Sequence, residues 1–376
     1  MAQTHDAIQR VQVDALEGGE ILIRLHTAAG VTGIGAFRAH PSVGVAVARD
    51  LLAPDVTGMS VHAPAVLWDR LFYRHGRTGQ HIQAIAAVDI ACWDALGKTL
   101  GRPVYDLWGG AARTTLPLYW SQGLGSRKTP GEMLADVRRG HGMGFRAYKI
   151  RMDWGPTVLD ADPAADMERF RVCRDFLPDD CTLSFDCNWG YTVSTAIRQG
   201  ELLQELGAFH YEEPLPHVNL PGYRQVADAL SIPVSCGELE ATRWRFRDLI
   251  LLANPDILQP DILNAGGPTE VRRIFDLAAA HNKPLMPHSP AIGIRSLASL
   301  HLFATGLGNT LPHEFSDEEL ADRNLERAQE LYNEPVLPVD GASTLSDAPG
   351  FGLTLNDAVL QKVESRRGAP CRRWRE

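Results

Sequence analysis

Three carboxylate side chains recur at an even spacing in the middle of this chain. Asp186 ends the apolar run LSFD, Glu212 follows FHY, and Glu238 follows IPVSCG. The interval is 26 residues in both cases, about the length of one strand, one loop and one crossover helix. A parallel barrel places the C-terminal ends of its strands on one face, so we expect the three carboxylates to converge there. Such an oxygen-only set favours Mg²⁺ over Zn²⁺.

Further polar side chains continue this period on both sides. Asp261 in ILQPD, His288 in PLMPH and Glu314 in LPHEF follow at intervals of 23, 27 and 26 residues. Upstream, the strand-like FRAYKIRM carries Lys149 and Arg151, whose side chains share one side of a strand because they are two residues apart. Ionisable groups therefore recur at the ends of successive apolar runs.

In this order the motifs resemble the enolase superfamily and, within it, the mandelate racemase subgroup and its acid-sugar dehydratases. The resemblance is carried by Lys149-Ile150-Arg151, Asp186-Cys187-Asn188, Glu212-Glu213-Pro214, Gly237-Glu238, the Asp261/His288 pair, Glu314 and the stretch Ala84–Gly110. It implies an α/β fold, a modified (β/α)8 TIM barrel with an α+β capping domain formed by the N-terminal segment and the C-terminal return. It also implies that Lys149 and His288 face opposite sides of a substrate. The family often has a second lysine where Arg151 stands, and arginine keeps the charge but cannot act as a base.

A physical argument supports the expected role of each candidate catalytic group. Arg151 and desolvation are expected to lower the pKa of Lys149 toward neutrality, where the amine can accept a proton. Asp261 can bind the far ring nitrogen of His288 and raise its basicity. Glu314, if protonated, could donate a hydrogen bond to a substrate carboxylate. The metal candidates remain Asp186, Glu212 and Glu238, with Mg²⁺ as the cofactor.

Such a site suits removal of the proton beside a carboxylate, because a metal and oriented donors stabilise the enediolate that results. The resemblance favours Mg²⁺-dependent dehydration of a sugar acid, an aldonate or aldarate, to a 2-keto-3-deoxy sugar acid, which is a hydro-lyase reaction. Racemisation or epimerisation of a 2-hydroxy acid and cycloisomerisation of a sugar-acid lactone use the same groups and stay open. Which of Lys149 and His288 abstracts the proton also stays open. A barrel that only binds is disfavoured, because every catalytic position is filled.

Composition limits the class of protein and its partners. The chain has 376 residues, 44% of them hydrophobic, and a net charge of −9, which disfavours a general nucleic-acid footprint. Its six cysteines form no CxxC pair, so reduced and mostly packed thiols are expected. The N-terminus lacks an apolar signal core and no segment has membrane-spanning length, which favours the cytoplasm. The expected partners are a small-molecule carboxylate substrate and further copies of this chain in a homo-oligomer, with neither nucleic acid nor membrane.

The elements that position these groups fall into three predicted segments, a capping domain over residues 1–115, a barrel over 116–325 and a returning segment over 326–376. Residues 9–40 alternate like antiparallel strands, and helical stretches follow at 45–52, 64–72 and 82–100. Strand-like runs then alternate with helical ones to residue 315, including LPLYW, AYKIRM, LSFD, AFHYEE, PVSCGE, ILQPD, PLMPH and NTLPHEF. The basic ending RRGAPCRRWRE is expected to be a solvated tail.

The motifs do not identify the residues that contact the far end of a substrate. Asn188 lies two residues beyond Asp186 and could bind a ligand or substrate. Since the family's cap supplies distal contacts, its polar residues are candidates, namely Arg38, His40, Arg74 and His75. Asp89 and Asp94 of the stretch Ala84–Leu100 are expected to be structural.

Overall fold

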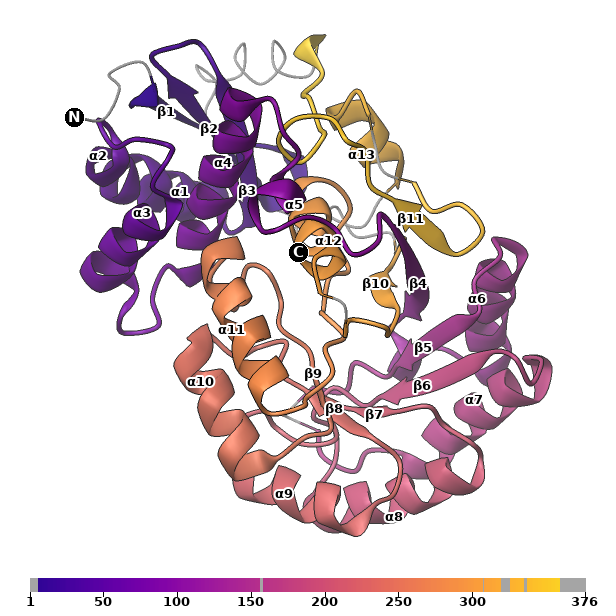
Figure 1. Ribbon diagram of the computed structural model, residues 1–376. Coiled ribbons are helices and arrows are strands. Elements are labelled where there is room, and N and C mark those ends of the chain that lie inside the picture. The colour runs from indigo at the N-terminus through magenta and orange to yellow at the C-terminus, as the bar shows by residue number, and fades with distance from the viewer. Residues whose placement is uncertain (1–5, 156–157, 307, 319–324, 335–336, 359–376) are drawn as a thin grey trace.

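The computed structural model describes residues 6–155, 158–306, 308–318, 325–334 and 337–358 in two packed parts (Figure 1). The first is an α+β cap, and the second is a curled parallel sheet surrounded by helices. This confirms the expected fold class. The basic C-terminal tail and Cys371 lie outside the described residues. The other five cysteines are buried and free, as expected.

The cap begins with an antiparallel sheet in the order β1-β2-β3, formed by Ile8–Ala15, Glu20–Thr27 and Thr32–Arg38. A turn at residues 17–20 joins β1 to β2, so that Ala15 pairs with Ile21. The cap helices are α1 (Pro41–Ala46), η3 (Val47–Leu52), α2 (Ala53–Val56), α3 (Pro64–Leu71), η4 (Phe72–Gly76), α4 (Ile82–Leu100) and α5 (Val104–Leu107).

Helix α4 lies directly on β3, because small residues of both elements meet there. A Cβ atom at Gly35 would lie 2.1 Å from the carbonyl oxygen of Ala87, and one at Gly33 would lie 2.1 Å from that of Ala91. Only glycine therefore permits this approach of strand and helix. Asp94 of α4 accepts hydrogen bonds from the backbone N–H groups of Ile34 (2.9 Å) and Phe351 (2.9 Å), which confirms its structural role.

The barrel strands pair in parallel in the order β10-β4-β5-β6-β7-β8-β9. Their bounds are Thr115–Gln122 (β4), Ala147–Arg151 (β5), Thr182–Asp186 (β6), Tyr211–Glu212 (β7), Val234–Cys236 (β8), Ile257–Leu258 (β9) and His313–Phe315 (β10). The run PLMPH forms only one parallel bridge, between Leu285 and Leu258, because Pro284 and Pro287 have no N–H to donate. Pairing of β10 with β4 brings the first and last strands together.

Helices cover the outside of this sheet (Figure 1). They are α6 (Pro130–Gly142), α7 (Pro163–Phe176), α8 (Val193–Glu205), α9 (Leu220–Ala229), α10 (Thr242–Asp248), η6 (Leu249–Ala253), α11 (Pro268–Ala280) and α12 (Ile294–Ala304), with short turns η2 (Glu17–Gly19) and η5 (Gly125–Arg127) elsewhere. Local sequence sets some of their ends. Thr129 and Glu132, for example, form a capping box at the start of α6.

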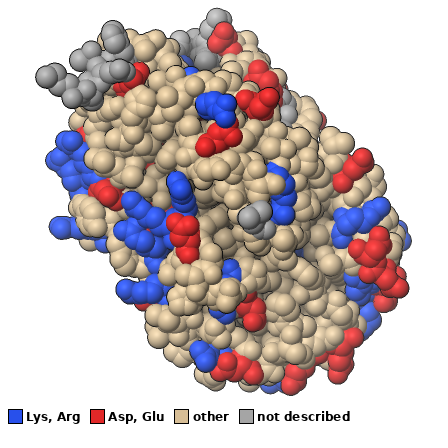
Figure 2. Space-filling view, in the orientation of Figure 1, with Lys and Arg blue, Asp and Glu red and all other residues tan. Residues whose placement is uncertain are grey.

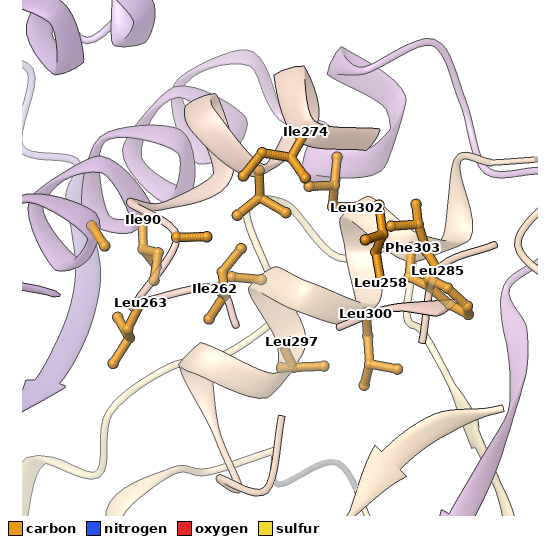
Figure 3. Close-up of a cluster of buried hydrophobic side chains, with 14 of the residues drawn as sticks. Ile90, Leu258, Ile262, Leu263, Ile274, Leu285, Leu297, Leu300, Leu302 and Phe303 are labelled. Carbon is orange, nitrogen blue, oxygen red and sulfur yellow. The ribbon is translucent and has the colours of Figure 1, made fainter. Parts of the chain in front are cut away.

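The cap and the barrel share one apolar interior. Figure 3 shows Ile90 of α4 in the same cluster as Ile262 and Leu263, which follow β9, and Leu297 of α12. Polar contacts add to this joint. The Asp89 carboxylate in α4 accepts hydrogen bonds from the backbone N–H and the hydroxyl of Thr269, both at 2.7 Å, and so caps the N-terminus of α11 from outside that helix. Asp89 is therefore structural, as expected.

The chain returns to the cap after the barrel. Helix α13 (Leu325–Leu331) precedes β11 (Ala342–Thr344), which pairs antiparallel with β4. Residues 349–351 then contact the cap, where Gly350 bridges Pro103. In the part of the chain that the structure describes, no helix has the length and apolarity needed to cross a membrane. Figure 2 shows acidic and basic side chains interspersed over the visible face.

Candidate active site

The structure gathers the predicted polar groups at the C-terminal ends of the barrel strands. Lys149 lies in β5, Asp186 ends β6, Glu212 ends β7, and Glu314 lies in β10. Glu238, Asp261 and His288 lie in the segments that follow β8, β9 and the Leu285 bridge. Parallel strands bring these positions to one face because their carboxyl ends point the same way.

Lys149 lies at the centre of this group. Its Nζ is 3.3 Å from Asp186 Oδ2 and 3.3 Å from Glu314 Oε1, and it donates a hydrogen bond to Glu212. The side chain is 1% exposed, and Nζ lies over the ring of Tyr119 at 5.6 Å. A buried ammonium among carboxylates is held by charge and hydrogen bonds together.

The prediction that the pKa of Lys149 is lowered is wrong for this structure. Burial lowers that pKa, but the carboxylates of Glu212 and Glu314 outweigh burial and raise it well above its ordinary value. The reason is that Lys149 faces acidic neighbours from three other strands, which spacing along β5 does not reveal. As the structure stands, Lys149 is a cation.

Arg151 is bound by other carboxylates, and it is not among the groups that shift the pKa of Lys149 most. Its Nε donates to Asp153 Oδ1 at 2.8 Å, and its Nη2 contacts both oxygens of Glu318 at 3.1 and 3.2 Å. These contacts tie β5 to the segment after β10. Arg151 thus belongs to a buried ion-pair network, and its role as a tuner of Lys149 stays a prediction.

His288 and Asp261 form the expected pair. His288 Nδ1 lies 2.8 Å from Asp261 Oδ2, while Nε2 lies 3.5 Å from Glu238 Oε2 and 4.0 Å from Glu314 Oε2. Asp261 is itself oriented, since its Oδ1 accepts the backbone N–H groups of Leu263 and Asn264 at 2.8 Å each. Burial lowers the pKa of His288, but Glu238, Glu314 and Asp261 raise it to about 9.

Glu314 is ionised, so the prediction of a protonated donor is wrong. Burial raises its pKa, but the positive charges of Lys149 and His288 bring it below the ordinary value. Its Oε2 accepts the backbone N–H of Ser289 at 2.8 Å. An ionised Glu314 can accept hydrogen bonds from a substrate hydroxyl and cannot donate one.

The donor chemistry of the three predicted ligands fits a hard divalent cation. Burial raises the pKa of Asp186 and of Glu238, and the Glu212 carboxylate raises both further. Asp186 Oδ2 accepts no hydrogen bond from any described residue. Among those residues no three His, Cys, Asp or Glu side chains converge as a ready metal site, and the Lys149 ammonium instead lies between the carboxylates. Carboxylates this close together favour a cation between them, and oxygen donors suit Mg²⁺.

Two neighbours complete the carboxylate cluster. Glu213 is buried and accepts a hydrogen bond from the Trp189 indole, which indicates a structural role. Gln259 was missed by the sequence analysis, and its Nε2 donates to Glu212 Oε2 at 2.6 Å. Its position two residues before Asp261, just after β9, is the signal that could have found it.

Asn188, a predicted substrate contact, lies beside Asp186. Its backbone N–H donates to Asp186 Oδ1 at 2.9 Å. Its side-chain oxygen has no hydrogen-bond partner among the described residues.

The cap residues predicted to contact substrate separate into two groups. Arg38 lines a cleft of about 380 Å³ between cap and barrel, whose other walls include Gln83, Leu239 and Asn264. His40 is nearby in sequence and contacts the Ser42 hydroxyl at 2.8 Å. Arg74 and His75 are directed elsewhere, since both bind the carboxylate of Asp55, at 2.8 and 2.6 Å.

Comparison with known families decides the relationship. The family described as "Enolase C-terminal domain-like" matches residues 132–359. The family described as "Mandelate racemase / muconate lactonizing enzyme, N-terminal domain" matches residues 11–109. The chain belongs to the enolase superfamily. The resemblance inferred from the motifs is therefore confirmed, and this superfamily member is an enzyme.

Several relatives resemble this enolase superfamily member over nearly its whole length. An arabinonate dehydratase from Saccharolobus solfataricus is 28% identical over 353 residues, covering 92% of this chain and 91% of the relative. An L-rhamnonate dehydratase from Saccharopolyspora erythraea is 31% identical over 346 residues, covering 91% and 84%. A mandelate racemase/muconate lactonizing protein from Paracoccus denitrificans, solved in complex with magnesium, is 35% identical with a TM-score of 0.88 and coverage of 95% and 98%.

Proposed function

We propose that this enzyme uses Mg²⁺ to remove the proton beside the carboxylate of a sugar acid and then eliminates the β-hydroxyl, giving a 2-keto-3-deoxy sugar acid. The observation that carries the proposal is the His288–Asp261 pair, which opens onto the carboxylate cluster. The two curated relatives described above are named as dehydratases of sugar acids, an arabinonate and an L-rhamnonate. Both support an aldonate substrate.

Asp186, Glu212 and Glu238 would hold the ion, and the relative solved with magnesium supports this choice of metal. A bound Mg²⁺ would neutralise the negative charge that develops on the substrate carboxylate. Its charge would also act against the carboxylates that raise the pKa of His288, so the imidazole would lose its proton more readily.

His288 acts as the base. The His288 side chain is 16% exposed, whereas that of Lys149 is 1% exposed and its Nζ is enclosed by carboxylates. Nε2 of His288 takes the α-proton, because Asp261 binds Nδ1 and thereby fixes the ring tautomer. The electron pair of the C–H bond becomes a carbon–carbon double bond.

The same residue completes the elimination. The imidazolium returns its proton to the β-hydroxyl, the carbon–oxygen bond breaks, and water leaves. The resulting enol becomes the keto acid. Lys149 supplies positive charge beside Glu212 and Glu314 and so balances the acidic cluster.

The test is a panel of aldonates and aldarates incubated with the enzyme and Mg²⁺, with keto-acid formation followed as a semicarbazone and optical rotation followed in parallel. Dehydration predicts keto acid. Racemisation predicts a change of rotation without keto acid, and cycloisomerisation predicts turnover of a lactone instead.

Two variants show which residue abstracts the proton. His288→Asn should lose about 10²–10⁴ of turnover and also lose α-proton exchange in D₂O, since the base is gone. Lys149→Met should lose turnover through weaker charge balance. The exposed His281 provides a matched control, and His281→Asn should behave like the parent. Full α-proton exchange in His288→Asn would assign the base to Lys149.

A further inference from the structure

The cap holds the segment that connects β9 to α11 at three separate points. The Trp68 indole donates to the carbonyl oxygen of Gly266 at 2.6 Å, and Asp89 accepts the backbone N–H of Thr269 at 2.7 Å. The third contact is the hydrogen bond from Gln83 Nε2 to Asn264 Oδ1, at 2.7 Å. This segment contains Asp261, so the cap holds the part of the barrel that orients His288.

Asn264 differs from the other two contact points because it also binds the active site. Its side-chain Nδ2 donates to the backbone carbonyl of Glu238 at 2.9 Å. Its backbone N–H donates to Asp261 Oδ1 at 2.8 Å. A single residue therefore connects the cap helix α4, a predicted metal ligand and the carboxylate that orients the base.

We propose that Asn264 is a positioning residue, which uses the hydrogen bond from Gln83 to hold the Glu238 segment in the arrangement that binds Mg²⁺. This inference rests on the proposed metal-dependent function. Groups that orient a metal ligand commonly change metal affinity 10–100-fold when they are removed. Asn264 meets that description because it binds the backbone carbonyl of Glu238 and not its carboxylate.

The amide chemistry of both residues is required. Asn264 must accept from Gln83 and donate to Glu238 at the same time, which an amide does and a carboxylate does not. Both Gln83 and Asn264 also line the cleft between cap and barrel, next to Leu239. A change in KM could therefore come from lost substrate contact, so the decisive measurement must be made without substrate.

The experiment is calorimetric titration of Mg²⁺ into the metal-free full-length chain, its variants Gln83→Leu and Asn264→Leu, and the double variant. Asn264→Leu should weaken Mg²⁺ binding about tenfold or more. Gln83→Leu should weaken it less, because Asn264 keeps its bond to Glu238. The double variant should match Asn264→Leu, since the two residues act through one bridge.

Asn309 gives a matched control, because its Nδ2 also donates to a backbone carbonyl, that of Phe303, at 2.9 Å and away from the active site. Asn309→Leu should lower the melting temperature and leave Mg²⁺ affinity unchanged. An unchanged affinity in folded Asn264→Leu, or independent effects that multiply in the double variant, would overturn the proposal. If the parent binds Mg²⁺ but dehydrates no sugar acid, the proposed reaction fails while the affinities still decide the role of Asn264. A parent that binds no Mg²⁺ overturns both.

Discussion

Nδ1 of His288 lies 2.8 Å from Oδ2 of Asp261, and the remaining oxygen of Asp261 is held by two backbone N–H groups. The carboxylate therefore cannot rotate without breaking bonds at both oxygens. This fixes the ring of His288 with Nε2 toward Glu238 and Glu314. Because Asp261 holds the ring in this way, a change at Asp261 should change the pKa of His288.

Activity should rise with pH as His288 loses its proton, since a base must be neutral. The surrounding carboxylates raise the pKa of His288 to about 9, and removing one of their charges lowers it. We therefore expect Asp261→Asn to move the acid limb of kcat/KM to lower pH. Its maximum rate should fall about 10²-fold or more, because the tautomer is no longer fixed. The measurement is a pH series of kcat/KM for parent and variant.

Asp256 offers a control in the segment that enters β9, the same strand that Asp261 follows. Its carboxylate accepts the backbone N–H of Val234 at 2.9 Å, away from His288. Asp256→Asn should leave the pH profile in place. If the acid limb of kcat/KM in Asp261→Asn lies at the same pH as in the parent, the pair does not set the protonation of His288.

Removal of the metal should affect both activity and stability. Turnover should stop in excess chelator and return with Mg²⁺. Mg²⁺ at about 100 times its Kd should add about 2.7 kcal/mol to the free energy of unfolding. Asp186→Asn should lose most of that gain, which thermal melts with and without Mg²⁺ would reveal.

Without metal, Asp186→Asn should be at least as stable as the parent, because burial and Glu212 disfavour the ionised form of Asp186. Glu201 is an exposed glutamate of α8, and Glu201→Gln should keep the full Mg²⁺ response. Undiminished turnover in excess chelator would refute the metal requirement.

Arg151 should matter to stability more than to the pH profile. Its guanidinium contacts Asp153 and Glu318, and its side chain is 8% exposed. Arg151→Met removes the cation that faces the carboxylates of Asp153 and Glu318, so we expect a loss of about 3 kcal/mol in the free energy of unfolding. Arg151→Lys should lose less, because it keeps the charge but not the two-pronged contact. Urea unfolding measures both.

The exposed Arg138 packs on the ring of Phe176 at 5.1 Å and offers a comparison outside this network. Arg138→Met should change the free energy of unfolding by less than about 1 kcal/mol. An alkaline shift of kcat/KM in a stable Arg151→Met variant would instead restore the role of Arg151 as a tuner of Lys149.

The joint between cap and barrel should depend on pH through Asp89. Burial raises the pKa of Asp89 to about 7, so the folded chain holds a proton that the unfolded chain releases near pH 4. Stability from this group is complete below about pH 4 and is lost as the pH rises to about 7. Asp89→Asn has no proton to lose, so its stability relative to the parent should improve by about 4 kcal/mol over that range.

Urea unfolding at pH 4 and pH 7.5 would measure this difference. The amide can still accept from the backbone N–H of Thr269, and the Thr269 hydroxyl can turn to accept from the amide. Asp179→Asn changes an exposed carboxylate and should show no such trend. Parallel stability curves for parent and Asp89→Asn would refute the buried-proton account.

The sequence by itself predicted the barrel fold, and it predicted which polar side chains lie at the carboxyl ends of the barrel strands. Asp186, Glu212 and Glu238 end apolar runs at the interval of one βα unit, and that unit repeats because local strand and helix lengths are set by nearby residues. The Asp261–His288 pair followed from the same interval, and the structure brings the two together.

Only the tertiary structure decided the charge states and the connections between distant segments. Arg151 binds Glu318, which lies 167 residues further along the sequence, and Gln83 binds Asn264, which lies 181 residues further along. The same holds for Lys149 and Glu314, whose protonation is opposite to what the sequence suggested. A pKa depends on burial and on every charge nearby in space, whereas sequence spacing reports only the neighbours along one strand.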